Sequence, residues 1–69
     1  MMFPSPDAEK NYVASELDKL HQAGKIRFSW LEIERAFVVI RRDSAGHGDI
    51  VKRVAGHGDF IALKSDLQP

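Results

Sequence analysis

The short block Ala-Gly-His-Gly-Asp occurs twice near the C-terminus, at residues 45–49 and 55–59. Histidine nitrogens and aspartate oxygens both bind divalent metal ions, so two such blocks placed side by side would offer a set of ligands. The blocks lack the ligand spacing that makes a zinc signature specific. Glycine and aspartate also favour tight turns, in which the aspartate bonds to its own backbone. We therefore predict two turns and assign no metal ligands and no cofactor, and metal binding by the turns stays open as the alternative.

A hydrolytic site is the second chemistry that these residue types suggest. Ser44, His47 and Asp49 lie within one short segment, whereas a working triad draws its nucleophile, base and acid from supporting elements that also supply oxyanion donors. No nucleophile-elbow pattern surrounds Ser44. The Gly-X-Gly spacing is also not followed by the Lys-Ser or Lys-Thr of a phosphate-binding loop. We expect a protein that is not an enzyme.

Length and composition favour one small domain, residues 1–69, with flexible ends at 1–4 and 65–69. There is no cysteine, which removes disulfides and cysteine-based metal sites as means of stabilisation. A chain this short buries only about 60% of the surface that its unfolded form exposes, so we expect a homodimer. Ten basic residues balance ten acidic ones, which argues against affinity built on phosphate contacts.

The N-terminal segment and the hydropathy of the chain bear on its location. The first residues, Met-Met-Phe-Pro-Ser-Pro, are neither cationic nor followed by an apolar core, unlike a signal peptide. No apolar run approaches the roughly 18–20 residues that a membrane span needs. We expect a cytoplasmic protein that does not contact a membrane.

The N-terminal third of the chain has the pattern of an amphipathic helix over residues 6–23. Ser5 suits the N-cap, Pro6 suits the first helical position, and Gly24 suits a left-handed C-terminal residue. Apolar residues then recur at helical spacing. We expect this stripe to be shared between the core and a dimer interface; it consists of Val13, Leu17 and Leu20.

Residues 25–42 carry conflicting signals. Alternation around Phe28 favours a brief extended segment at 25–28. The sequence Ser29-Trp30-Leu31-Glu32 matches a capping box, and Glu32 with Arg35 would form a pair one helical turn apart. We therefore predict a second helix from about Trp30. The β-branched run at 37–40 favours a strand instead, so the structure of residues 37–42 stays open between helix and strand.

The repeat predicts the C-terminal architecture. Each turn introduces an apolar run, and we expect strands at Ile50–Val54 and Phe60–Leu63 joined as an antiparallel hairpin. A third strand would form if residues 37–42 are extended, and Ser65–Pro69 would be a polar tail. The predicted fold class is α+β: an N-terminal amphipathic helix, a second short helix or helix-strand segment, and a C-terminal hairpin.

Aromatic and arginine residues in the middle of the chain are the types that dominate protein interfaces. We predict a binding function, because one helix and one hairpin cannot cover every apolar side chain. The candidate partner-binding residues combine apolar anchors, guanidinium groups and carboxylates: Phe28, Trp30, Arg35, Arg41, Arg42, Glu16 and Asp18.

Two resemblances suggest what the protein binds. Leu17-X-X-Leu20, Gly24-Lys25-Ile26 and residues 29–33 resemble the opening of a winged-helix domain, although little room remains for a recognition helix. In length and type the chain is also similar to short phage accessory proteins, in particular anti-activators of Mu-like phages that inhibit a quorum-sensing transcription factor. That resemblance implies a host partner, the DNA-binding domain of a LuxR-type regulator. Carboxylates of this chain would then cover the regulator's DNA-reading surface, among them Glu16, Asp18, Glu32 and Glu34. The winged-helix resemblance implies a DNA-binding regulator as the alternative.

Overall fold

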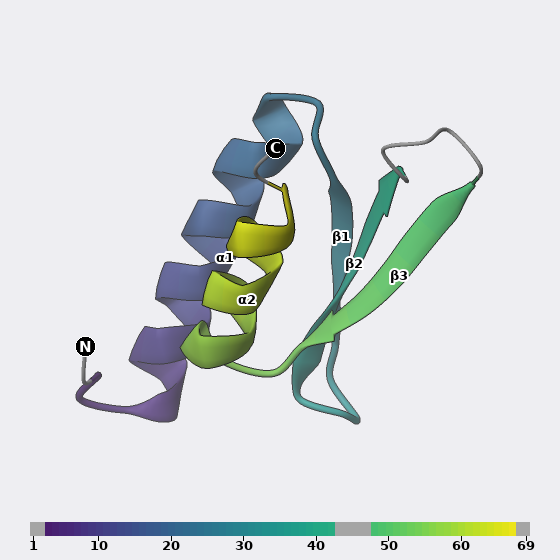
Figure 1. Ribbon diagram of the computed structural model, residues 1–69. Helices are drawn as coiled ribbons and strands as arrows, with labels where there is room; N and C mark the ends of the chain where they lie inside the picture. Colours follow the sequence, from purple (N-terminus) through teal and green to yellow (C-terminus); the bar gives the residue numbers. More distant parts are fainter. Residues whose placement is uncertain (1–2, 43–47, 68–69) are drawn as a thin grey trace.

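The computed structural model describes residues 3–42 and 48–67, and it has two layers (Figure 1). Helix α1 (Pro6–Gln22) is followed by strands β1 (Arg27–Leu31), β2 (Ala36–Arg42) and β3 (Asp49–Val54), and then by helix α2 (His57–Leu67). The strands form one antiparallel sheet in the order β1-β2-β3. Both helices pack on the same face of that sheet. The α+β class is confirmed.

Helix α1 begins and ends where the sequence indicates. The Ser5 hydroxyl accepts a hydrogen bond from the Ala8 N–H at 3.1 Å, and Pro6 occupies the first turn. Gly24 has a φ of +76°, a left-handed conformation that ends the helix and that glycine adopts without strain. The predicted helix over 6–23 is confirmed to within one residue.

The helix predicted from about Trp30 is wrong. Ser29 and Trp30 lie inside β1, and the capping box does not form. A tight turn at 32–35 reverses the chain instead, closed by the Arg35 N–H donating to the Glu32 carbonyl at 3.2 Å. The β-branched run at 37–40 becomes β2, which settles the open segment as a strand. Residues 27–31 are extended because they pair with β2 along their whole length, with Trp30 directly opposite Phe37.

The two halves of the predicted C-terminal hairpin have different outcomes. Ile50–Val54 lies within β3, which pairs with β2 as the expected third strand. Phe60–Leu63 is helical rather than a strand, so the hairpin across residues 55–59 does not exist. Helix α2 also extends through residues 65–67, which the sequence analysis placed in a polar tail. Neither helix in the described ranges is long and apolar enough to cross a membrane.

Two carboxylates from different elements start α2. The Asp59 side chain accepts a hydrogen bond from the Ala55 N–H at 2.9 Å. The Glu9 side chain, from α1, accepts one from the His57 N–H at 2.7 Å. Backbone N–H groups in the first turn of a helix have no partner within the helix, and negative charge is favourable there. These contacts explain why residues 55–59 begin a helix rather than a hairpin turn.

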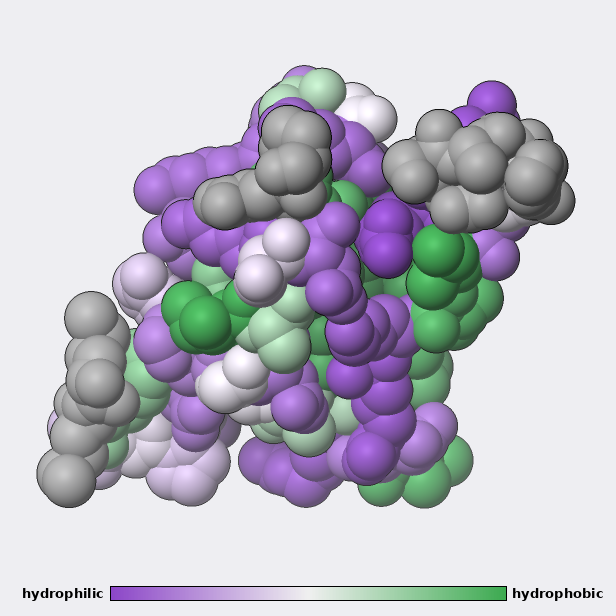
Figure 2. Space-filling model, in the orientation of Figure 1, coloured by the Kyte–Doolittle hydropathy of each residue, from purple (hydrophilic) through white to green (hydrophobic). Residues whose placement is uncertain are grey.

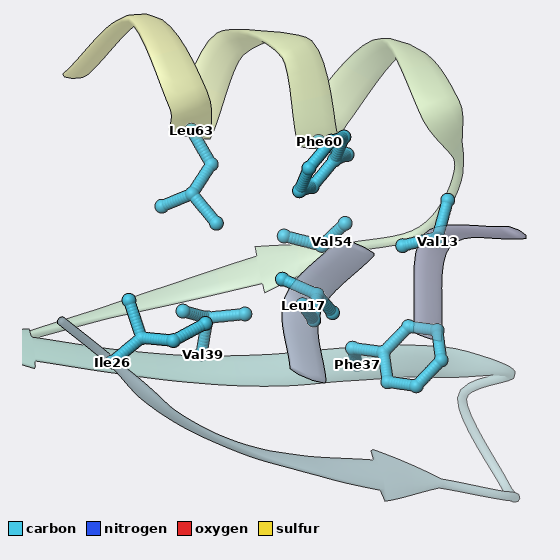
Figure 3. Close-up of a cluster of buried hydrophobic side chains, with 8 residues drawn as sticks. All are labelled: Val13, Leu17, Ile26, Phe37, Val39, Val54, Phe60 and Leu63. Carbon is cyan, nitrogen blue, oxygen red and sulfur yellow. The ribbon is translucent and has the colours of Figure 1, made fainter. Parts of the chain in front are cut away.

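The core lies between the helices and the sheet (Figure 3). Val13 and Leu17 of α1 are only 1% and 0% exposed, so most of the apolar stripe on α1 is interior to a single chain. Leu20 is half-buried at the margin of the core. The buried cluster draws on both helices, the sheet and the segment before β1: Val13, Leu17, Ile26, Phe37, Val39, Val54, Phe60 and Leu63.

Candidate protein-binding surface

The face of the sheet that is turned away from the helices is the main candidate surface. Side chains alternate between the two faces of a strand, and Phe37, Val39 and Val54 face the helices. Their neighbours therefore face the other way, and no helix covers them in the described part of the chain. We call this set the open face. It comprises Arg27, Ser29 and Leu31 of β1, Ala36, Val38, Ile40 and Arg42 of β2, and Asp49, Val51 and Arg53 of β3. Ala36 is 0% exposed, so it adds no accessible surface to this face.

An apolar patch crosses the middle of the open face. Ile40 lies opposite Val51 on β3, and Val38 lies beside Ile40 two residues along β2. Val51 is 66% exposed, and Val38 and Ile40 are half-buried. In Figure 2, hydrophobic surface is visible beside the upper part of β3, next to hydrophilic surface nearer the helices. Contiguous exposed apolar surface with a polar border is typical of interaction sites.

Guanidinium groups border this patch. Arg27 is opposite Ile40, Arg53 is opposite Val38, and Arg42 is opposite Asp49. The Arg53 Nε lies 3.2 Å from a carboxylate oxygen of Glu34, in an ion pair whose side chains are about half exposed. Such a pair is largely hydrated and costs little to rearrange. The open face therefore combines apolar side chains with arginines, which is the composition enriched in protein interfaces.

The tip of the β1–β2 hairpin holds the large apolar side chain with the greatest exposure among the described residues. Ile33 is 99% exposed. Beside it, the Trp30 indole N–H donates to the Glu32 carboxylate. This bond lowers the pKa of Glu32 below its ordinary value, with Lys10 and Arg35 adding to the effect. The Arg35 guanidinium lies 3.9 Å from the same carboxylate, so the predicted Glu32–Arg35 pair forms, but across a turn instead of along a helix.

The predicted aromatic anchors lie on the covered face of the sheet. The ring centroids of Phe28 and Trp30 are 6.0 and 4.8 Å from that of Phe37. The Lys10 ammonium lies over the Trp30 ring, 4.1 Å from its centroid. A cavity of about 200 Å³ beside Trp30 is smaller than the roughly 300–1,000 Å³ of ligand sites. Phe28 and Trp30 are therefore half-buried residues that pack against the edge of the core.

The predicted arginines are dispersed. Arg35 occupies the hairpin turn with a φ of +49°. Arg41 lies on the helix-facing side of β2, where its charge contributes to a lowered pKa of Asp66, although Lys52 is the main cause. Only Arg42 belongs to the open face. The structure therefore brings one of the three to the candidate surface.

The predicted carboxylates lie on α1. Glu16 is 3.1 Å from the Lys19 ammonium, which lowers the pKa of Glu16. The Tyr12 hydroxyl also donates to Glu16, and this bond raises the pKa of Tyr12. Asp18 is exposed. Neither carboxylate is near the open face, because α1 covers the opposite side of the sheet.

Sequence reasoning missed Val38, Ile40, Val51, Arg27 and Arg53 as candidate surface residues. The alternation of Arg27, Ser29 and Leu31 with Phe28 and Trp30 was a usable signal. It was outweighed by the capping-box pattern, which assigned Trp30 to a helix. Once the segment is known to be a strand, its alternation places the charged and polar residues on the face away from the core.

The repeated histidines do not form a shared site in the described part of the chain. The His57 ring packs against the rings of Phe3 and Tyr12, with centroid distances of 5.3 and 5.4 Å. Ser44 and His47 lie outside the described residues, so the candidate triad and the paired metal site are not observed. Within residues 3–42 and 48–67, no three His, Asp or Glu side chains gather closely enough to hold a metal ion.

Comparison with protein-family models, with curated proteins and with solved structures found no significant match.

Proposed function

We propose that this chain is a small, non-enzymatic, cytoplasmic regulatory protein that binds a larger host protein through its open face. The observation that supports the proposal is the apolar patch of Val38, Ile40 and Val51 on a sheet face that neither helix covers. Burying such side chains against a partner gains about 25 cal/mol per Å² of apolar surface. A folded chain that leaves this surface in water retains that driving force for association.

Charge complementarity defines the chemistry of the partner. Arg27, Arg42 and Arg53 border the apolar patch, and Asp49 is the one acidic residue of the open face as defined above. Guanidinium groups bind carboxylates with paired hydrogen bonds in a fixed geometry. The surface fits an apolar patch that is itself bordered by aspartate or glutamate residues.

The narrower target, a LuxR-type activator, remains a prediction that the carboxylates support less than the sequence suggested. Glu16 and Asp18 lie on α1, whereas Glu32 and Glu34 lie in the hairpin turn. The two groups are on separate parts of the surface (Figure 1). We therefore propose an acidic docking surface on the host regulator rather than its basic DNA-reading surface.

Nucleic-acid binding is the second candidate, and one observation favours it. A hollow of about 440 Å³ at the start of β1 is lined by Lys25, Arg27, Arg41 and Arg42, with Asp49 as the one acidic residue. Basic clusters of this kind bind phosphates. The winged-helix arrangement is not its basis, because only a tight turn lies between β1 and β2 where the second helix was expected.

A pulldown from nuclease-treated bacterial lysate tests the main proposal. We expect one protein at near-stoichiometric amounts with the wild-type chain. The double variant Arg27→Glu/Arg42→Glu should lose it, because both substitutions reverse charge at the border of the patch. The matched control Lys19→Glu/Lys64→Glu makes the same change in net charge on the helices and should retain the partner.

Two results would contradict the main proposal, the first by removing the open face as the binding site and the second by removing protein binding. Equal loss of the partner in both double variants would show a response to net charge alone. Recovery of DNA or RNA only when nuclease is omitted, with retention that falls steeply as salt rises, would establish the nucleic-acid candidate instead.

A further inference from the structure

Among the residues that the structure describes, strand β3 is an edge of the sheet, with β2 on one side only. A free edge presents unpaired N–H and C=O groups that another strand can bind. Natural edges are commonly protected by proline or by charged side chains. Residues 49–54 contain no proline, and their three charged residues are not all of one sign. The Lys52 ammonium is bound to Asp66 of α2 on the covered side of the sheet, and Asp49 and Arg53, on the open face, have opposite charges that a reversed copy of the strand can pair. The edge of β3 is therefore suited to strand addition.

A second copy of the chain can pair with this edge in only a few registers. Two copies of β3 related by a two-fold axis run antiparallel. Residues directly opposite each other must then have side chains on the same face of the joined sheet. Odd and even positions of β3 face opposite sides of the sheet, so an odd residue can lie opposite only an odd residue, and an even residue opposite only an even one. The two-fold axis must therefore pass midway between the two copies of one central residue. Centres at Ile50, Val51 and Lys52 are the candidates within the strand.

The charges select one of these centres. A centre at Lys52 places Lys52 directly opposite its own copy, which is repulsive. A centre at Ile50 places Asp49 opposite the apolar Val51. A centre at Val51 places Asp49 opposite Arg53 twice, once on each side of a Val51–Val51 contact. In that register residues 49–53 of the two copies pair, with Ile50 opposite Lys52 on the covered face, and Gly48, which precedes the strand, lies opposite Val54.

We infer that the chain forms a two-fold dimer through antiparallel pairing of β3 with β3, centred on Val51. The open face of this strand, read as Asp49, Val51 and Arg53, is complementary to itself when reversed. Arg53 already contacts Glu34, but a guanidinium group has five N–H donors and can bind a second carboxylate.

The other edge of the sheet lacks this complementarity. The open-face residues of β1 are Arg27, Ser29 and Leu31. Reversed pairing about Ser29 places Arg27 opposite Leu31, with no ion pair. The contrast between the two edges makes β3 the dimer edge.

The dimer extends the surface of the proposed function but does not depend on it. Pairing joins two sheets into one, and Val51 brings the apolar patches of both copies together across the seam. The exposed fraction of Val51, 66% in one chain, would fall on association. A partner-binding failure and a dimer failure are separable, because the dimer test changes residues of β3 and the partner test changes Arg27 and Arg42.

Reciprocal charge reversal tests the pairing. Analytical ultracentrifugation of the wild-type chain should give twice the chain mass, falling to the monomer on dilution. Asp49→Arg alone places arginine against Arg53, and Arg53→Asp alone places aspartate against Asp49, so each variant should be monomeric. An equimolar mixture restores both ion pairs in a heterodimer, and its mass should double again. Circular dichroism confirms that each single variant is folded.

A second pair of variants tests the centre and avoids the existing contacts of Arg53. Val51→Lys and Val51→Glu each place like charges on the two-fold axis, so each should be monomeric alone and dimeric when mixed. Arg27→Glu, at the β1 edge, is the matched control and should leave the wild-type dimer unchanged. A wild-type chain that stays monomeric at the highest soluble concentration, or folded variants that fail to associate on mixing, would overturn the inference.

Discussion

The two copies of Ala-Gly-His-Gly-Asp end in opposite structures. After the first copy, Asp49 opens strand β3, whereas in the second copy Asp59 lies in the first turn of α2. The difference arises from the residues that come after each block and from the contacts that each block makes. Ile50 and Val51, which are β-branched, come after the first block, and the strand that they belong to pairs with β2. Residues 62–64 are good helix formers, and Glu9 of α1 binds the backbone at the start of their helix. Identical local sequence therefore does not determine the fold here.

Truncating the first apolar residue after each block should give the largest contrast. Phe60 lies on the buried side of α2 and is 2% exposed. Phe60→Ala should therefore cost about 3–5 kcal/mol of unfolding free energy, through lost burial and the cavity left behind. Ile50, its counterpart, is half-buried on β3, and Ile50→Ala should cost about 1–2 kcal/mol. Urea unfolding followed by circular dichroism measures both.

A domain of this size rarely has more than about 3–5 kcal/mol of stability, so Phe60→Ala is expected to be largely unfolded. Phe60→Leu, which keeps most of the volume, serves as the milder variant with a cost of about 1–2 kcal/mol. Equal costs at positions 50 and 60 would contradict the inference that the residue after the second block is packed in the core more completely than the residue after the first.

The two glycines of the second block should respond to alanine in opposite directions. A Cβ on Gly56 would lie 2.8 Å from a carboxylate oxygen of Glu9. The carboxylate would have to move away from the His57 N–H, and loss of that hydrogen bond should cost about 1–2 kcal/mol. A Cβ on Gly58 meets no atom within 4 Å, so Gly58→Ala should stabilise α2 by about 0.5–1 kcal/mol.

The same urea experiment distinguishes the two glycine variants, and the combination Glu9→Ala/Gly56→Ala is the control. Once the carboxylate is absent, alanine at position 56 has no oxygen to displace. Its further cost should then be close to zero. A full additional cost in the Glu9→Ala background would place the effect in the backbone of Gly56 and not in the contact with α1.

Much of the fold could be predicted because its signals are local. Ser5, Pro6 and Gly24 define α1 by capping chemistry and backbone freedom, and the β-branched run defines β2. The failures arose where two local signals competed. Ser29 and Glu32 match a helix start, but pairing with β2 prevails because it packs Phe28 and Trp30 against Phe37. Likewise the start of α2 depends on Glu9, which is distant in sequence.

The candidate surface was harder to predict than the fold. Residue type alone suggested Phe28, Trp30 and Arg41, but all three lie on the helix-facing side of the sheet. Which face of a strand is covered depends on where both helices pack. Misassigning one strand as a helix therefore displaced most of the predicted site, and Arg42 alone lies on the open face.

The smallest expected effect is electrostatic, and it joins the two repeat-derived elements. Lys52 of β3 binds Asp66 near the end of α2, and this contact lowers the pKa of Asp66 below its ordinary value of 3.8. A carboxyl group whose pKa is lower in the folded state stabilises that state above the unfolded value. The contribution should be fully present at neutral pH and should disappear as pH falls from about 3.8 through the folded pKa.

Asp66→Asn removes this contribution, so the difference in unfolding free energy between wild type and variant should shrink over that pH window. Both side chains are more than a third exposed, so added salt should also reduce the difference. A gap that stays constant with pH would show that Asp66 contributes through hydrogen bonding independent of its charge.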